Sequence, residues 1–167
     1  ASSVAKRIQN NKQNNDSLKI LTQIQKEKEE DMKKYLRSVI NLNNGNLLAT
    51  LVKALLPLEI PAFQVPPLAA NPDSLKWVWN YNYNKNHFFD NVDLTDERLL
   101  RTPILHARLQ AFFSNVVIQS ADSINKEIDK IIKKCEKNYK VFQFVSVFLF
   151  NHFRESEIMG HDAVILK

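Results

Sequence analysis

The residues whose types could do chemistry gather in one stretch, which runs from Asn86 to His106 and reads NHFFDNVDLTDERLLRTPILH. Two acids of such a stretch could act as the general acid and general base of a glycosidase. The sequence shows no accompanying pattern of residues that would bind a sugar substrate. The favoured interpretation is that arginines pair with clustered carboxylates and so pin an irregular segment to neighbouring helices. The candidate residues of this motif are Asp90, Asp93, Asp96, Glu97, Arg98 and Arg101.

Metal and redox chemistry find little support in the sequence. A calcium loop needs oxygen ligands at alternating positions and a glycine at the turn, and DNVDLTDE has neither the spacing nor the glycine. The histidines show no zinc-ligand spacing; they are His87, His106, His152 and His161. Cys135 is the single cysteine, which excludes an internal disulfide, a CxxC pair and a cysteine zinc site, and it is expected at a surface or half-buried helix position. No catalytic, metal or cofactor-binding residue is assigned, and no cofactor is expected.

A run of aromatic residues precedes this stretch: Trp77, Trp79, Tyr81 and Tyr83. Their alternation with polar residues is typical of a strand, and the pattern alone leaves helix and strand open. Asn71, Pro72 and Asp73 form a helix-start signature, which favours a helix. These rings could stack on sugars or bases, although aromatic packing with the intervening asparagines pointing to solvent is the favoured interpretation.

The charge of the chain, +5 with a pI near 9.3, invites a nucleic-acid hypothesis. The lysines, however, alternate with acids, both in Lys19 to Arg37 and in Lys126 to Lys140, which is typical of a solvated helix face. No nucleic-acid partner is therefore expected. The longest apolar run, Val141 to Phe150, is too short to span a membrane.

Hydrophobic spacing and scarce glycine predict an all-α fold, a single domain of about six to seven helices over residues 1–167 without a substantial sheet. Helices are expected from Asp16 to about Asn43, from Asn46 to Pro57, and onward from Asn71. Further ones should follow Thr95, Thr102 and Ser120. The apolar helix over 141–150 should be central to the core. Residues 1–15 should be weakly ordered, residues 57–71 should form a proline-rich packed loop, and a last helix should begin near Asp162 and be cut short at 167.

Three strings carry a family resemblance: LVKALLPLEIP, HFFDNVDLTDERLLRTPILH and KVFQFVSVFLFNHFRESEIMGHDAV. They resemble a helical domain of unassigned function found in secreted proteins of Gram-negative gut anaerobes. In those proteins the domain precedes a thioredoxin-like domain of the thiol-disulfide oxidoreductase or peroxiredoxin-like type. The resemblance covers the chain from about Asp16 onward.

The resemblance implies export to the periplasm or cell envelope, where a lipid anchor upstream of Ala1 is one possibility, and a thioredoxin-like domain after Lys167. Neither a thioredoxin strand pattern nor a CxxC occurs in this chain. Any oxidoreductase activity would therefore belong to that further domain, and this chain is expected not to be an enzyme. The leading hypothesis is an accessory domain that contacts the redox domain or its protein client. The alternative is a stand-alone peptide- or glycan-binding module that uses the aromatic run.

Overall fold

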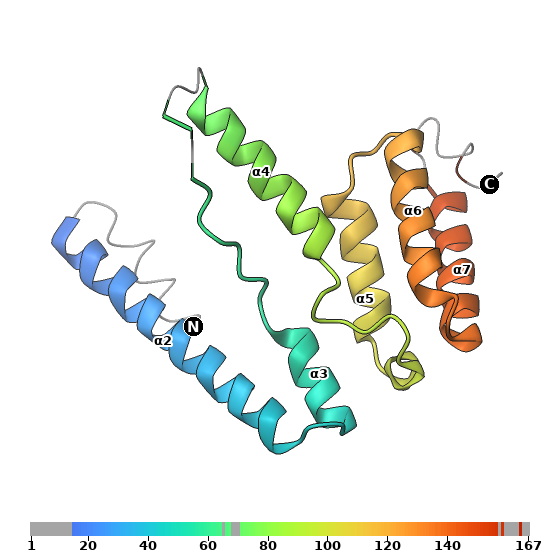
Figure 1. The fold of residues 1–167 in the computed structure, drawn as a ribbon, viewed down its shortest axis with the longest axis horizontal. Helices are drawn as coiled ribbons and strands as arrows, with labels where there is room; N and C mark the ends of the chain where they lie inside the picture. The colour runs from blue at the N-terminus through green and yellow to red at the C-terminus, as the bar shows by residue number, and fades with distance from the viewer. Residues whose placement is uncertain (1–14, 65, 68–70, 157, 159–163, 165–167) are drawn as a thin grey trace. The chain divides into compact units, whose positions relative to one another are not determined.

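A computed structural model describes residues 15–64, 66–67, 71–156, 158 and 164, and side chains from residue 19 onward (Figure 1). All regular structure in these residues is helical and none of them lies in a strand, so the predicted all-α fold class is confirmed. The predicted weakly ordered start lies outside the described residues, and so does the last helix apart from Val164. The chain contacts divide it into two compact units, residues 1–56 and 57–167.

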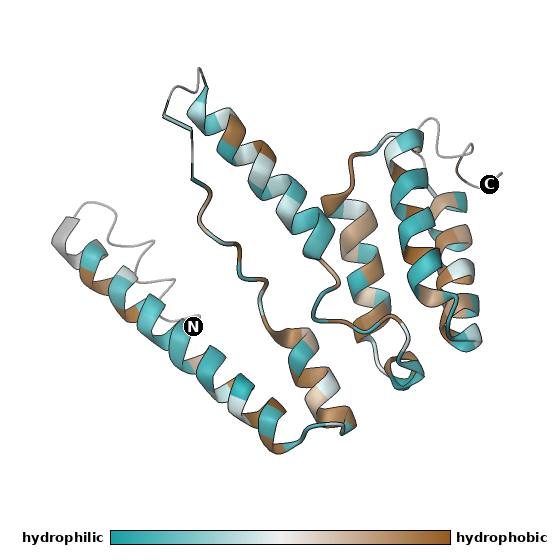
Figure 2. Cartoon of the chain, viewed as in Figure 1, coloured by the Kyte–Doolittle hydropathy of each residue, from teal (hydrophilic) through white to brown (hydrophobic). Residues whose placement is uncertain are grey.

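The described part of the first unit holds two helices, α2 (Asn15–Leu42) and α3 (Leu47–Leu55). They contact each other across a turn in which Gly45 has a φ of +81°, a backbone conformation that favours glycine. Figure 2 shows α2 as mostly hydrophilic and α3 as mostly hydrophobic. The polar middle of α2 is largely exposed, and side-chain hydrogen bonds between residues four apart support the helix there (Gln23 to Glu27, 2.9 Å; Gln25 to Glu29, 2.8 Å).

The second unit begins with the proline-rich segment, whose described residues form neither helix nor strand. Phe63 of this segment stacks on Trp79, whereas Ile60 is exposed, so only part of the predicted packing is present. The helix α4 (Pro72–His87) follows with proline at its first turn, which settles the ambiguous aromatic run as a helix.

Beyond α4 the chain turns through residues 88–96 into a short 3-10 helix, η1 (Glu97–Arg101), and then into α5 (Ile104–Ala111). Thr95 had been the expected cap of η1, but Asp96 holds that position, because its carboxylate accepts the backbone N–H of Arg98. The turn after α5 widens into a π-helical segment, η2 (Phe112–Val116), where the N–H of Val117 bonds the carbonyl of Phe112 at 3.0 Å.

Two long helices complete the described chain, α6 (Ala121–Cys135) and α7 (Tyr139–Arg154). The expected cap Ser120 is present, as its hydroxyl accepts from the N–H of Ser123. The two helices pack against each other, and η1 contacts α7. The core of this unit contains mainly aliphatic and phenylalanine side chains, among which Leu99, Leu109, Phe113, Ile124, Val141 and Val145 are fully buried.

The prediction that the apolar helix over 141–150 is central to the core holds for only one face of α7. Val141, Val145 and Phe153 are buried on one face, but Val147 and Phe150 on the other are each at least half exposed. One side of α7 thus packs on the core while the other presents apolar side chains outward. The two faces of α7 thus differ in burial although both carry apolar residues.

Candidate functional site

The first two acids of the motif are occupied by hydrogen bonds to close neighbours. Asp90 Oδ2 lies 2.6 Å from Nδ1 of His87, one turn back at the end of α4. Asp93 Oδ1 accepts both the backbone N–H and the hydroxyl of Thr95, at 2.8 and 2.7 Å. Such bonds fix a turn between an aspartate and the residue two positions on. Both acids therefore shape the chain after α4.

The other acids are paired with bases. Arg98 donates to both carboxylate oxygens of Asp96, with Nη2 at 2.7 Å and Nε at 2.9 Å, and this bond raises the arginine's pKa. Glu97 reaches across to Lys140 on α7 at 3.1 Å. The four acids thus bond four different partners and do not converge on one centre, so the arrangement lacks the facing pair of carboxylates that hydrolysis of a glycoside needs.

Arg101 does not take part in this pairing, which corrects the prediction that both arginines reach the carboxylates. Its side chain is exposed, and no described residue forms a hydrogen bond or ion pair with it. We expect Arg101→Ala to change the free energy of unfolding by less than about 0.5 kcal/mol, because exposed side chains without partners contribute little. Urea unfolding followed by circular dichroism checks this. A loss above about 1.5 kcal/mol, the value for a charge-paired hydrogen bond, would contradict it.

The apolar residues of the same stretch hold it to the core. Phe89, Val92, Leu94 and Leu99 are all buried. One long-range bond adds to this packing: Asn138 donates from Nδ2 to the backbone carbonyl of Thr95 at 3.0 Å. The Oδ1 of Asn138 also accepts the N–H groups of Lys140 and Val141, which caps α7. The sequence analysis does not predict this link, which joins residues 43 positions apart.

The aromatic residues of α4 form two ladders along the helix. In the first, Trp77 stacks on Tyr81 with ring centroids 5.7 Å apart, and Nζ of Lys85 lies 5.5 Å from the Tyr81 ring. The second ladder contains four stacked rings from the loop to the end of α4: Phe63, Trp79, Tyr83 and His87. The rings therefore stack on one another along α4, although none of these residues is buried.

Each ladder is anchored at the C-terminal end of α4. Lys85 forms an ion pair with Glu127 of α6 at 3.4 Å, and Glu127, only 5% exposed, also accepts from Lys130 at 2.8 Å. The second ladder ends at His87, which is bonded to Asp90. Sequence reasoning missed Glu127, although an acid three residues after Ile124 and four before Ile131 stands in the apolar stripe of α6.

The N-terminal half of α4 has no such anchor. None of the sixteen residues of α4, each of which the structure describes, is buried, and every residue from 71 to 78 is exposed. The apolar side chains there are Leu75, Trp77 and Val78, and Trp77 is 67% exposed. Trp77 is therefore a largely exposed tryptophan, and Leu75 and Val78 on the same half of the helix are exposed as well.

The single cysteine is not where the sequence placed it. Cys135 is fully buried at the end of the α6 stripe, and burial raises the pKa of its thiol to about 11, with Lys134 acting weakly in the opposite direction. A thiol with so high a pKa is a poor nucleophile near neutral pH. The residue therefore acts as a small core side chain.

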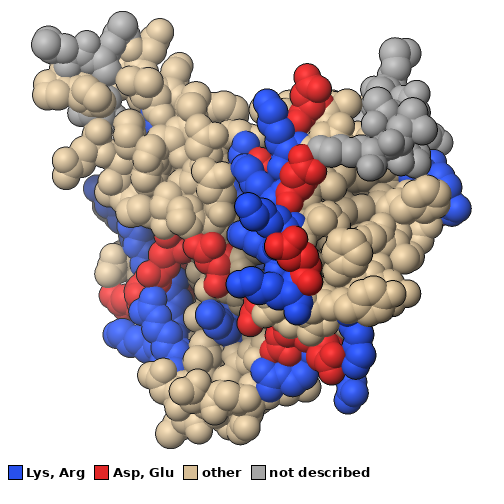
Figure 3. Space-filling view, turned by 45° about the vertical axis from the view of Figure 1, so that its right-hand side comes forward, with Lys and Arg blue, Asp and Glu red and all other residues tan. Residues whose placement is uncertain are grey.

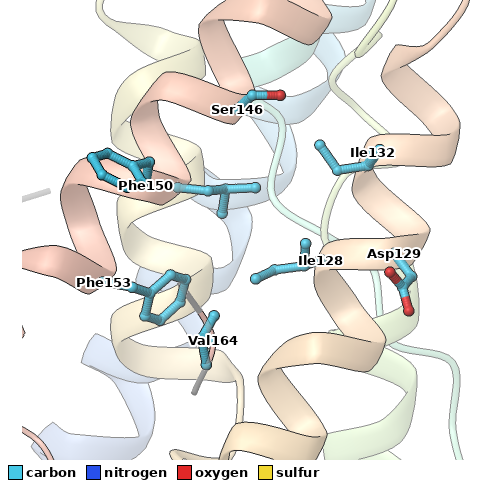
Figure 4. A pocket seen from close by; sticks show the side chains of 8 residues that line it. Ile128, Asp129, Ile132, Ser146, Phe150, Phe153 and Val164 are labelled. Atoms are coloured by element: carbon cyan, nitrogen blue, oxygen red, sulfur yellow. The ribbon is translucent and has the colours of Figure 1, made fainter. Parts of the chain in front are cut away.

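An apolar hollow of about 360 Å³ lies between α6 and α7 (Figure 4). Ile128 and Ile132 of α6 face Phe150 and Phe153 of α7 across it, and Val164 closes one side. Asp129 and Ser146 are the polar side chains of its lining. The hollow has the apolar lining of a small-molecule site but lacks convergent polar groups that would orient a reacting substrate.

No group of three or more His, Cys, Asp and Glu side chains in the described part of the chain is placed to hold a metal ion. Among the same residues, no helix is both long and apolar enough to cross a membrane.

Comparison with known proteins gives one match. A family model described as "Domain of unknown function (DUF5106)" matches residues 21–165, which spans both compact units. Neither the curated proteins nor the solved structures contain a match to this chain. Since the family model covers most of the sequence, the chain belongs to the family of this domain of unknown function, DUF5106.

Proposed function

We propose that this chain is a non-catalytic binding domain that contacts a partner through the N-terminal half of α4. The observation that carries the proposal is the exposure of three apolar side chains, Leu75, Trp77 and Val78, on the same half of a helix that has no buried residue. Tryptophan is among the residues that contribute most to protein interfaces, and it is seldom left exposed beside other apolar groups. A partner that covered these three side chains would remove the exposed apolar surface of α4 from water.

The rest of α4 supports the proposal, because it holds these three side chains in a defined position. The ion pair between Lys85 and Glu127 and the ring ladder through Trp79 fix the C-terminal half of the helix to its own unit. The exposed half then continues from a rigid base. Binding costs less ordering entropy when the contact surface is held in this way.

The placement of the acids also favours binding over catalysis. Asp90, Asp93, Asp96 and Glu97 are each bonded to a residue of the chain, in four separate positions. A hydrolase that used these acids would need two of them free and facing one substrate. The motif instead supports a structural role, in which it connects α4 with α7.

The partner that we propose is a thioredoxin-like domain of the same exported polypeptide, or its client, and the supporting argument is the family resemblance. The chain would then act in the periplasm or cell envelope, as the accessory part of a thiol-disulfide oxidoreductase. The redox step would belong to that further domain, since Cys135 is buried and has no second cysteine with which to pair.

The test uses the full-length natural protein and this chain, compared by amide hydrogen exchange. We expect a thioredoxin-like domain in the full-length protein and exchange over residues 72–80 about tenfold slower or more than in this chain, because a docked helix opens less often. Trp77→Ala in the full-length protein should restore fast exchange. The matched control is Tyr139→Ala, which removes another exposed aromatic side chain and should leave the protection of α4 unchanged. Equal exchange in both proteins, or a full-length protein without a thioredoxin-like domain, would overturn the proposal.

A second candidate is peptide or glycan binding on the rings of α4, the surface of Trp77, Trp79, Tyr81 and Tyr83. The stacked pair of exposed Trp77 and half-buried Tyr81 favours it, since sugars and peptide groups pack on aromatic ring faces. Titration with a neutral hexasaccharide such as maltohexaose distinguishes the two candidates. Saturable quenching of tryptophan fluorescence that Trp77→Ala abolishes would support this second function, and unchanged emission would exclude this sugar as its ligand.

A further inference from the structure

The two helices of the first unit leave much of their apolar surface in water. Among the described side chains of this unit, only Ala49 and Ala54 are buried, although α2 and α3 contact each other. Met32, Tyr35 and Leu42 of α2 are each more than half exposed. A pair of helices that buries so little is marginal by itself, because packing of an amphipathic face supplies most of a helix's stability. The apolar face of α2 therefore needs a cover.

The exposed apolar side chains of α2 belong to one seam along the helix. Its six apolar members are Leu21, Ile24, Met32, Tyr35, Val39 and Leu42. Together with Lys28, which holds the one polar position of the seam, they recur at intervals of three or four residues. Two helices that carry such a seam can pack along it as in a coiled coil. Leu21 and Val39 are half-buried and the other four apolar members are exposed, so the seam is available to a second helix.

The seam is symmetric about the midpoint between Asp31 and Met32. The pairs at equal distances from this point are Leu21 with Leu42, Ile24 with Val39, and Lys28 with Tyr35. When two copies of α2 run antiparallel about a two-fold axis at the midpoint, the members of each pair meet across the interface. Two of the three pairs are then apolar, and the ammonium of Lys28 can stack on the ring of Tyr35.

The charges beside the seam complement themselves about the same midpoint. Glu27, Asp31 and Lys34 recur at intervals of four and three on one flank of the seam, and all three are exposed. Since the two acids precede the midpoint and the lysine follows it, Lys34 of each copy would lie between Glu27 and Asp31 of the other. Within one copy Lys34 lies 3.9 Å from Asp31, and such an exposed pair contributes little. The antiparallel pairing would add charge attractions between the copies.

We infer that a second copy of this chain covers the seam, through an antiparallel two-fold pairing of α2. An anionic membrane fits less well, because helices that lie on membranes carry mainly Lys and Arg on the polar face, whereas Glu27 and Asp31 flank this seam. Basic and acidic side chains are likewise interleaved on the face of the molecule drawn in Figure 3. The inference goes beyond the proposed function and uses none of the residues of α4.

Sedimentation equilibrium of this chain, from micromolar to submillimolar concentration, tests the pairing. We expect the natural chain to form a dimer as its concentration rises. Lys34→Glu, and separately the double variant Glu27→Lys, Asp31→Lys, should each weaken the dimer about tenfold or more, because like charges then face each other. An equimolar mixture of the two variants should associate almost as the natural chain does, because every charge in the mixed pair again meets an opposite one. The matched control, Lys26→Glu, reverses an exposed charge on the opposite face of α2 and should leave the dimer unchanged.

A cysteine beside the proposed axis gives a second measurement. Met32→Cys should form a covalent dimer under mild oxidation, because only residues next to a two-fold axis meet their own counterpart at disulfide distance. Leu42→Cys is the matched control, since Leu42 is 84% exposed against 57% for Met32 but lies far from the axis. It should cross-link much less in spite of its greater exposure. Cys135 is buried and does not compete.

Circular dichroism checks that each variant is folded, and the cysteine measurement decides where a charge variant is not. A natural chain that stays monomeric throughout the concentration range would overturn the inference, as would a mixture of variants that fails to restore the dimer or equal cross-linking at the two cysteine positions. A monomer that loses thermal stability on Tyr35→Ser would assign the seam to the rest of the same chain instead. A monomer that binds phosphatidylglycerol vesicles would assign it to a membrane, and both of these results would contradict a second copy as the cover.

Discussion

Replacing Phe113 by alanine should cost about 3–5 kcal/mol of unfolding free energy, the usual loss when a buried phenylalanine is truncated to alanine. Phe113 is fully buried, and its ring packs edge to face on Phe112 at 5.3 Å and on Phe153 at 5.5 Å. It connects the end of α5 with the end of α7, so the cavity would open between two helices. Urea unfolding followed by far-ultraviolet circular dichroism measures the loss.

The matched control for Phe113 is Phe150→Ala on α7, because Phe150 is 50% exposed. Its truncation should cost less than about 1.5 kcal/mol, since only part of its ring leaves an apolar surrounding. Similar losses for the two variants would contradict the assignment of Phe113 to the core and of Phe150 to the outward face of α7.

The second large effect should come from Asn138, which joins the acidic motif to α7. Asn138→Ala should cost about 2–3 kcal/mol, because it removes both the cap of α7, worth about 1 kcal/mol, and the hydrogen bond to the Thr95 carbonyl, which leaves a half-buried acceptor without a partner. The same urea unfolding experiment measures it.

Asn138→Asp separates the two contributions. A carboxylate can still cap α7 but cannot donate to the carbonyl of Thr95, so this variant should lose about 1–2 kcal/mol. Amide exchange should also become faster over residues 93–101, which the bond holds in place. A loss below about 0.5 kcal/mol for Asn138→Ala would show that the motif is held by its apolar residues alone.

Much of the helical architecture could be predicted from the sequence, because helix boundaries depend on neighbouring residues. Proline at the start of α4 and the serine before α6 each mark a terminus through local chemistry. The π-helical turn η2 could not be predicted in this way. It allows the adjacent Phe112 and Phe113 both to be buried, which depends on what α7 places opposite them.

Burial was less predictable than secondary structure. The apolar composition of α7 suggested burial on all sides, yet Val147 and Phe150 face outward because the described residues pack mainly on one of its faces. Conversely, Glu127 and Cys135 are buried because they occupy positions of the α6 stripe, at the same spacing as Ile124 and Ile131. The helical spacing of α6 therefore predicts that Glu127 and Cys135 are buried, whereas their residue types do not.

In the candidate site too, contacts between neighbouring residues could be predicted from the sequence and long-range contacts could not. The motif of acids was recognisable, and the bond between Asp96 and Arg98 is local enough to be expected. The partners Lys140 of Glu97 and Asn138 of Thr95 lie some forty residues away, so their contacts depend on the fold.

The most direct test of the account concerns the exposure of Trp77. The variant Trp79→Phe leaves Trp77 as the single tryptophan of the chain and keeps an aromatic ring beside Phe63. Acrylamide quenching of its fluorescence is then compared between this chain and the full-length protein that carries the same substitution. We predict strong quenching in the chain and much weaker quenching in the full-length protein, because the proposed partner domain would cover the ring. Equally strong quenching in both would contradict the claim that the exposed half of α4 is a binding surface.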